Sequence, residues 1–541
     1  MSSTNTVEVK PSPLGGKGTF TTRACEAGDV VFSLDRPLIA TLDRARIADT
    51  CSWCFSWTDL PGLSGAGINQ TAKVNWCSGC KKVKYCSKRC QSQSWKAIHK
   101  RECKELASQA EPLPNTVFAV IQMMEGLSVG DQRYSSILEL DAHRDDFEKA
   151  GGQRWDSMQL MATTAMSVMR AKGVNVAGES ATMSMCVLMC NSSRLVTPTF
   201  DPLGLVLDPA IARLNHSCDP NAVMVFDGPR LAARALAPIR EGDEVLISYI
   251  DNTAPYGVRQ GELQSQYFFD CKCTKCQLGN KAAQDAFLDP TSDFEERIKL
   301  IDDLLPKLVD DPAWPRHVLG ESKHEQRLSA LQFYAYSYLD SPDAARPTRD
   351  AASLRKAIAI IRNTGVWPLS RQPLPALYRQ YAIACLEGKR YNEAFIAMLR
   401  LHALIDPVVY PQAHHPVRVV HAWSLATLSK AIGSDPTSEF CRALQSQGVD
   451  LSMLFLALLF EVVEQVEKSH GSKSLFGQTV GGALQAMMEP GGELDSQFSL
   501  MGVSREQWPK IVEDRIKELW PKVLAFAEND DIAAQIDEAV A

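Results

Sequence analysis

Eight side chains of the kinds that bind zinc lie close together near the amino terminus. They form four close pairs, which are Cys51 with Cys54, Cys77 with Cys80, Cys86 with Cys90, and His99 with Cys103. One pair cannot complete a tetrahedral zinc site, whereas four pairs fill two sites. Without a metal, seven thiols in so short a stretch would be reactive. The spacing therefore predicts two closed zinc sites, which stabilise a fold and carry out no chemistry themselves.

A second cysteine cluster, at Cys271, Cys273 and Cys276, supplies only three thiols. A structural zinc site needs a fourth ligand. The candidate is Cys218, in the segment Leu214-Asn215-His216-Ser217-Cys218-Asp219-Pro220-Asn221. A single cysteine is more often a small buried side chain than a ligand, but the incomplete trio favours a ligand here.

Length and charge limit the class of protein. A chain of 541 residues is too long for one core and predicts two to four domains. The net charge of −7 argues against a protein that coats nucleic acid. From Lys73 to Lys104, however, the sequence contains ten Lys or Arg residues and only one acidic residue, Glu102. Two readings stay open: a basic face for an anionic partner, or compensation for negative zinc–thiolate sites.

The sequence also indicates the compartment. The first residues, MSSTNTVEVK, have no apolar core of a signal peptide. The most apolar run, from Met453 to Phe460, is far shorter than the ~20 residues of a membrane span. Cysteines at metal-binding spacing fit a reducing compartment better than a disulfide framework does. We expect a soluble protein of the cytoplasm, the nucleus or both, without a membrane partner.

Patterning predicts an α+β chain. Strand-like segments occur at 19–22, 30–32, 222–226 and 244–249. Helical spacing of apolar residues begins at about residue 113, as in Val117, Val120, Ile121 and Met124, and returns beyond residue 285. Gly388 ends one predicted helix shortly before the next, which indicates an antiparallel helix pair. Helices are also predicted at 455–466 and 508–526. Residues 55–76 contain two glycine-rich turns and are predicted to be a looped insertion.

The ordered set of motifs resembles a known family. Asn215 to Asn221, followed by Ile247-Ser248-Tyr249, is similar to the core signature of SET-domain lysine methyltransferases. The eight-ligand segment resembles a MYND finger. Together with Gln266 to Cys273, these motifs resemble the SET- and MYND-domain (SMYD) subfamily. The resemblance covers about residues 10 to 276, and beyond them it extends only to helical character.

The resemblance implies an architecture. A SET-domain β-fold would be interrupted by the finger, and the segment Asn215 to Cys218 would pass under a loop as a pseudoknot. A post-SET zinc site and a helical domain similar to tetratricopeptide repeats would follow. The implied boundaries are 1–50 and 191–270 for the SET parts, 51–103 for the MYND finger, 104–190 for a helical insertion, 271–284 for post-SET and 285–541 for the helical domain.

The resemblance also implies how three zinc ions are shared among the ligands. The finger would be cross-braced, although sequential pairing satisfies the spacing equally well. The implied sets are Cys51, Cys54, Cys86 and Cys90 for the first zinc, Cys77, Cys80, His99 and Cys103 for the second, and Cys218, Cys271, Cys273 and Cys276 for the third.

The activity implied by the resemblance is methyl transfer from S-adenosylmethionine to the ε-amine of a protein lysine. Tyr249 would be the catalytic residue, and Tyr267 and Phe269 would be walls of the substrate channel. The cofactor would contact Gly16, Lys17, Gly18, Asn191, Asn215, His216, Tyr249 and Phe269. On their own these residues have ordinary explanations: a glycine turn, a helix cap at Asn191, a core histidine and a strand tyrosine.

Partners follow from the same resemblance. The substrate would be a histone or another protein with an accessible lysine. Gln91 and Trp95 lie four residues apart, so they share a helix face, and matching positions in MYND fingers line a groove for proline-containing peptides. Inward packing of Trp95 is the alternative. A weakly active scaffold that binds such peptides is the second hypothesis for function. Nucleic-acid binding is weaker, because no base-reading helix is evident. We expect a monomer.

Overall fold

The structure is a computed structural model that describes residues 6–58, 73–279, 299, 303, 324–339, 350–365, 367–489, 492 and 508–529. Most of the insertion predicted at 55–76 lies outside the described residues, as do residues 280–284 of the predicted post-SET part. The polar tail after Asn529 also lies outside them.

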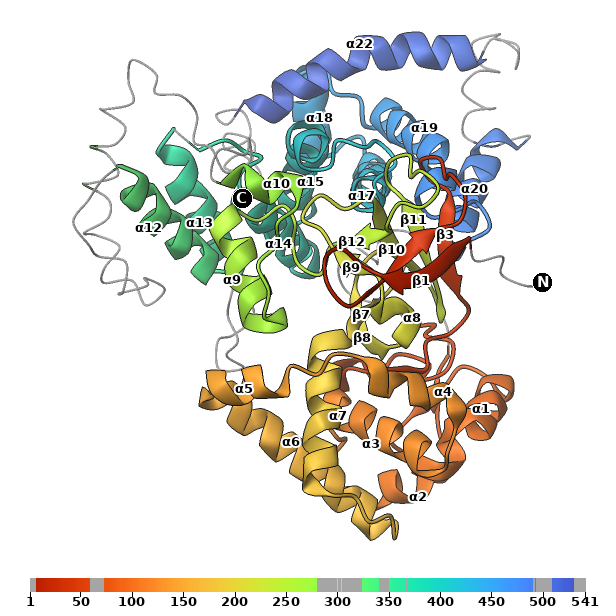
Figure 1. Ribbon diagram of the computed structural model, residues 1–541. Helices are drawn as coiled ribbons and strands as arrows, with labels where there is room; N and C mark the ends of the chain where they lie inside the picture. Colours follow the sequence, from red (N-terminus) through yellow and green to blue (C-terminus); the bar gives the residue numbers. More distant parts are fainter. Residues whose placement is uncertain are drawn as a thin grey trace.

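Short strands from both ends of the first half of the chain make up the β region. The first antiparallel pair is β1 (Val7–Pro11) with β2 (Lys17–Thr21). The order of one three-stranded sheet is β10 (Ala222–Asp227), β11 (Arg230–Ala235) and β3 (Val30–Leu34). The order of another is β4 (Ile39–Leu42), β8 (Pro202–Leu207) and β7 (Ser193–Val196). Strands about 200 residues apart therefore form one β region, with the intervening chain inserted between them (Figure 1).

The turn between β10 and β11 shows why the sequence folds back at this point. Asp227 pairs with Arg230, so only Gly228 and Pro229 form the loop. Gly228 has a φ of +60°, which favours glycine and suits the two-residue turns of β-hairpins. A Cβ atom at this position would also lie 2.9 Å from the carbonyl oxygen of Cys54. The hairpin therefore packs closely against the finger, defined here as residues 51–103.

Among its described residues, the finger contains one short strand pair besides its helices. β5 (Asn75–Trp76) pairs with β6 (Lys84–Tyr85). The helical part runs through α1 (Lys88–Ser94), a π-helical turn at Trp95–His99 and α2 (Lys100–Ser108). The Ser87 side chain caps α1 by accepting a hydrogen bond from the Cys90 amide. The looped insertion predicted at 55–76 was wrong for its last two residues. Asn75 and Trp76 form β5, which pairs with β6.

The helical insertion, residues 104–190, lies at the lower end of the molecule and packs in a core that also includes Ile39 of β4 and Leu205 and Leu207 of β8 (Figure 1). Its helices are α3 (Asn115–Ser128), α4 (Gln132–Ser135), α5 (Arg144–Ala150), α6 (Gly152–Ala171) and α7 (Gly178–Asn191), with a 3-10 turn at Ser136–Glu139. The predicted apolar stripe at Val117, Val120, Ile121 and Met124 is buried on α3. Helical spacing was thus a correct guide to this segment.

Helices also make up the described part of the tail, residues 285–541. They are α12 (His324–Ser337), α13 (Ala351–Asn363), α14 (Leu374–Glu387), α15 (Tyr391–Arg400), α16 (Asp406–Val409), α17 (Pro416–Gly433), α18 (Glu439–Ser446), α19 (Leu451–Ser469), α20 (Leu475–Met488) and α22 (Trp508–Glu528). The predicted pair around Gly388 is confirmed, because α14 and α15 are joined by three residues and pack together. The chain is therefore an α+β protein with a helical carboxy-terminal region.

Residues 285–541 contact the β region through hydrogen bonds near the end of α19. The Arg234 guanidinium on β11 donates hydrogen bonds to the carbonyl oxygens of Gly28 and Glu467, both at 2.9 Å. The ring of His470 donates from Nε2 to the carbonyl oxygen of Pro198 at 3.0 Å. A cation at the carboxyl end of α19 also suits the helix dipole. These contacts hold residues 285–541 beside the β region.

The strand predicted at 244–249 is short, since β12 (Leu246–Ile247) pairs only with β9 (Asn215–His216) and Glu244 makes an isolated bridge with Phe20. In the described part of the chain, no helix is both long enough and apolar enough to cross a membrane. The pseudoknot and the domain boundaries stay predictions.

Candidate active site and metal centres

A parallel strand pair brings the Asn215 to Cys218 segment beside the strand that leads to Tyr249. Leu246 lies opposite Asn215, and Ile247 lies opposite His216. The pairing continues for one more residue, because the Ser217 amide donates to the Ile247 carbonyl oxygen at 2.9 Å. Two motifs separated by about thirty residues therefore form one surface.

Tyr249 is fixed at both its main chain and its side chain. Its amide donates to Nδ1 of His216 at 3.0 Å, and its hydroxyl donates to the Leu214 carbonyl oxygen at 2.8 Å. Burial raises the pKa of Tyr249 well above the ordinary value of a tyrosine. The hydroxyl therefore stays protonated at neutral pH. Because its proton is directed to Leu214, a lone pair of the oxygen remains available as an acceptor.

Four rings from three segments, including the ring of Tyr249 itself, lie close together here. The ring centroids of Tyr249 and Tyr267 are 5.0 Å apart, and those of His216 and Phe269 are 5.8 Å apart. Tyr267 and Phe269 are themselves 6.5 Å apart. Burial raises the pKa of Tyr267 to about 12 and lowers that of His216 to about 4. The cluster is thus aromatic and carries no charge at neutral pH.

The predicted cofactor residues at the amino terminus lie beside this cluster. Asn215 donates from Nδ2 to the Lys17 carbonyl oxygen at 3.3 Å, so the glycine turn touches β9. Gly16 has a φ of +60°, which a glycine adopts without strain. The ammonium group of Lys17 forms an ion pair with Glu139 at 2.9 Å. Any contact of Lys17 with a cofactor would therefore use its main chain.

Asn191 is the last residue of α7, and its side chain has a clear structural task. Its amide donates to the Val187 carbonyl oxygen at 2.8 Å and to the Asp141 carbonyl oxygen at 2.7 Å. Asp141 in turn neighbours the glycine turn, since a Cβ atom at Gly16 would lie 3.8 Å from its carboxylate. Asn191 thus connects the end of α7 to the edge of the same site.

The finger brings its eight predicted ligands into two groups of four. In each group the ligand atoms lie within 4.8 Å of one another. The groups are Cys51, Cys54, Cys86 and Cys90, and Cys77, Cys80, His99 and Cys103. This is the cross-braced arrangement and not sequential pairing. Four thiols, or three thiols and an imidazole, in a closed tetrahedral group are the ligand sets of structural zinc.

The third group consists of Cys218, Cys271, Cys273 and Cys276, whose sulfur atoms also lie within 4.8 Å of one another. Cys218 is completely buried and lies two residues after the end of β9. Phe269 lies two residues before Cys271, so this group holds the aromatic cluster in place from one side. These residues fit a zinc ion bound by four thiolates, which would link residues 271–276 to the segment that follows β9.

Each cysteine group has a charged neighbour that sequence reasoning missed. Arg36 lies over the Trp53 ring, 3.7 Å from its centroid, near the thiols of the first group. Glu102 lies 3.8 Å from Nδ1 of His99 in the second group. Arg259 is fully buried and donates to the sulfur of Cys276 at 3.8 Å. Cations beside thiolates offset their negative charge, and a carboxylate orients a zinc-binding imidazole.

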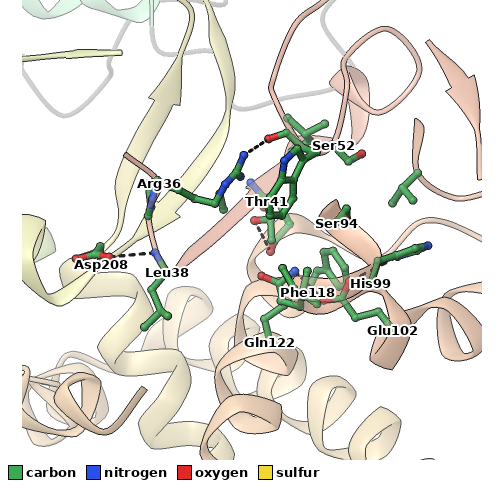
Figure 2. Close-up of a pocket in the computed structure, with 18 of the residues that line it drawn as sticks. Arg36, Leu38, Thr41, Ser52, Ser94, His99, Glu102, Phe118, Gln122 and Asp208 are labelled. Carbon is green, nitrogen blue, oxygen red and sulfur yellow. Dashed lines mark hydrogen bonds and ion pairs between the residues drawn. The ribbon is translucent and has the colours of Figure 1, made fainter. Parts of the chain in front are cut away.

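A cavity of about 480 Å³ lies between the finger and the helical insertion (Figure 2). Its lining includes Arg36 and Thr41 from the β3–β4 region, Glu102 from α2, and Phe118 and Gln122 from α3. Gln122 donates to the Glu102 carboxylate at 2.8 Å. Neither Tyr249 nor the rings around it line the cavity, so this space is distinct from the candidate active site.

The chain is similar to known proteins over part of its length. A family model described as "SET domain" matches residues 16–250. The "SET domain and MYND-type zinc finger protein 6" of Schizosaccharomyces pombe is 33% identical over 266 residues, which are 49% of this chain and 50% of that protein. The "Histone-lysine N-methyltransferase SMYD3" of Homo sapiens is 27% identical over 336 residues, which are 60% of this chain and 74% of that protein.

A third relative is the "N-lysine methyltransferase SMYD2" of Homo sapiens, which is 27% identical over 278 residues, or 50% of this chain and 60% of that protein. These alignments span from half to three quarters of the relatives' own lengths. Residues 16–250 therefore contain a SET domain. Over part of its length the chain is similar to a protein named for this domain and a MYND-type zinc finger, and to named lysine methyltransferases.

Proposed function

We propose that this protein is an S-adenosylmethionine-dependent N-methyltransferase that acts on lysine side chains of proteins. The observation that carries the proposal is the aromatic cluster around the Tyr249 hydroxyl, built on the β9–β12 pair of a SET domain. Named lysine methyltransferases among the relatives support the same class of reaction. The substrate would be a lysine of a histone or of another protein.

The residues that would hold the cofactor are the main chain of Gly16 to Gly18, the side chain of Asn215, and the ring of Phe269. Bound there, S-adenosylmethionine supplies an electrophilic methyl group on a sulfonium. The Asn191 side chain would contribute indirectly. Its hydrogen bond to the Asp141 carbonyl oxygen would position Asp141 beside the glycine turn at Gly16. His216 uses both ring nitrogens in structural contacts, so we assign it no proton transfer.

Tyr249 would orient the lysine amine. Its hydroxyl is protonated and already donates to Leu214, so its oxygen can accept a hydrogen bond from the incoming amine. Tyr267 and Phe269 would exclude water, and a dry site lowers the pKa of a buried lysine. The lysine must lose its proton to be a nucleophile, after which alignment is the main requirement for the displacement.

The finger would bind partner proteins and not take part in the reaction. Trp95 is 41% exposed on the helical face that it shares with the half-buried Gln91. Exposure of this tryptophan favours a groove for proline-containing peptides over inward packing. Three zinc ions, a monomer, and a location in the cytoplasm, the nucleus or both complete the proposal.

The test is to incubate the purified protein with methyl-labelled S-adenosylmethionine and a panel of lysine-rich proteins. We expect label on lysine side chains, and no label on the same proteins after their lysines have been acetylated. If zinc-replete protein binds no cofactor and labels no substrate, the proposed methyltransferase activity is contradicted. Peptide binding by a scaffold would then be the function.

A further inference from the structure

The strongest unexplained feature beside the candidate active site is the carboxylate of Glu244. This residue lies between β11 and β12 and is half-buried. We propose that Glu244 is a positioning residue. It directs the side-chain amide oxygen of Asn215, Oδ1, toward the ammonium group of the cofactor's amino-acid part. The inference rests on the proposed function and adds to it a residue that selects this part of the cofactor.

The geometry fixes which end of the Asn215 amide faces Glu244. Asn215 donates from Nδ2 to the Glu244 carboxylate at 2.7 Å and to the Lys17 carbonyl oxygen at 3.3 Å. Carboxylate and carbonyl oxygens only accept hydrogen bonds at neutral pH, so both neighbours require the NH₂ end. The two amide protons are then used, and the Asn215 oxygen points away from Glu244. That oxygen can accept a hydrogen bond from a donor such as an ammonium group.

Glu244 is itself held from several directions. Its other carboxylate oxygen accepts a hydrogen bond from the Ser12 hydroxyl at 2.9 Å. Its carbonyl oxygen accepts one from Asn221 at 2.8 Å. A Cβ atom at Gly18 would overlap the carboxylate, so glycine is needed there for the carboxylate to reach Asn215. One side chain therefore connects the β1–β2 hairpin with β9.

The charge of Glu244 has no cationic partner in the described part of the chain. No Lys, Arg or His nitrogen of the described residues forms an ion pair with it. A half-buried carboxylate without a cation favours binding of a positive group nearby. The ammonium group of the cofactor's amino-acid part has the required charge and donors. Glu244 would thus act through Asn215 and through its own negative charge.

The experiment compares two ligands that differ only in the amino-acid part. S-adenosylhomocysteine carries that part, whereas 5′-methylthioadenosine keeps the nucleoside and sulfur without it. We expect Glu244→Gln to weaken S-adenosylhomocysteine binding about tenfold or more, because a charge-assisted hydrogen bond is lost and the amide can turn. Binding of 5′-methylthioadenosine should change less than about twofold by titration calorimetry, given that the lost contact does not touch it. Glu241→Gln, an exposed residue of the same turn, is the matched control.

Equal weakening of both ligands would show that Glu244 only supports the fold, and unchanged binding of both would show that it has no role. Either result overturns the inference and leaves the proposed function intact. In an Asn215→Ala background, Glu244→Gln should weaken S-adenosylhomocysteine binding much less than in the wild type. A wild-type protein that binds neither ligand would instead overturn the proposed function together with the inference.

Discussion

The main-chain amide of Tyr249 donates a hydrogen bond to Nδ1 of His216 across 3.0 Å. An Nδ1 atom that accepts must leave the ring proton on Nε2, and Nε2 lies 3.3 Å from the sulfur of Cys218. The histidine therefore connects the residue proposed to orient the lysine with a ligand of the third cysteine group. In the proposed mechanism this ring would couple the residue that orients the lysine to the third metal site, without transferring a proton itself.

Removal of the third metal should disturb the active site because of this coupling. We expect Cys276→Ser to lower the zinc content from three ions per chain to two and to weaken cofactor binding, since Tyr267 and Phe269 precede the cluster directly. Cys441→Ser, which alters a buried thiol on α18 outside the three groups, should keep all three zinc ions. Elemental analysis and cofactor titration measure both effects. Three zinc ions in Cys276→Ser would contradict the ligand set.

The Glu102 carboxylate should strengthen zinc binding in the finger. It lies 3.8 Å from Nδ1 of His99 and also accepts from Gln122. Loss of a carboxylate that orients a zinc-binding histidine typically costs 10–100-fold in metal affinity. Glu102→Gln should therefore release one zinc ion to a chromogenic chelator sooner than the wild type does. Glu105→Gln on the same helix is the control, and equal release by the two variants would argue against this role.

Arg234 should stabilise the junction of the β region and the tail. Its hydrogen bonds to the Gly28 and Glu467 carbonyl oxygens, the first partly buried and the second exposed, would be lost in Arg234→Ala. We expect the free energy of unfolding to fall by about 1.5–3 kcal/mol, the range for hydrogen bonds of charged groups. Arg230→Ala changes an exposed arginine of the same strand and should cost less than about 0.5 kcal/mol. Urea unfolding measures both, and similar losses would contradict the contact.

Stability should fall in mild acid because of His470. Burial lowers the pKa of His470 to about 3, from an ordinary value of 6.5. The contribution to stability is complete above pH 6.5 and is lost as the pH falls from 6.5 toward 3, because only the unfolded chain takes up the proton. At pH 5 the loss amounts to about 2 kcal/mol.

His470→Gln removes this titration, so its free energy of unfolding should fall about 2 kcal/mol less between pH 7 and pH 5 than that of the wild type. His415, whose pKa burial also lowers to about 3, acts in the same direction and remains in the variant. Parallel pH profiles of the two proteins would refute the assignment to His470.

The sequence was informative where the pattern is local. Apolar residues at helical spacing predicted α3, α14, α15 and α19 because one helix face must be buried. The identities of the zinc-type ligands were equally clear. Their grouping was not, because sequential and cross-braced pairings fit the same spacing. Only the path of the chain places Nε2 of His99 3.3 Å from the sulfur of Cys77.

The residues that sequence reasoning missed act over long separations. Glu244 meets Ser12 across 232 positions, and Arg259 meets Cys276 across 17. Single charged residues of this kind have no period or spacing that marks them. The strand predicted at 244–249 was too long for a related reason: alternation shows which residues suit a strand, but the partner β9 offers only two residues for pairing.

The most direct measurement is methyl transfer in a single turnover by wild type and Tyr249→Phe, with cofactor binding measured on the same samples. The phenylalanine ring keeps the packing with Tyr267 and lacks the hydroxyl that would accept from the lysine amine. We predict that Tyr249→Phe binds S-adenosylmethionine within about threefold of wild type but transfers the methyl group at least about 100-fold more slowly. Equal rates in the two proteins, or no transfer by the wild type, would contradict an active site built around this tyrosine.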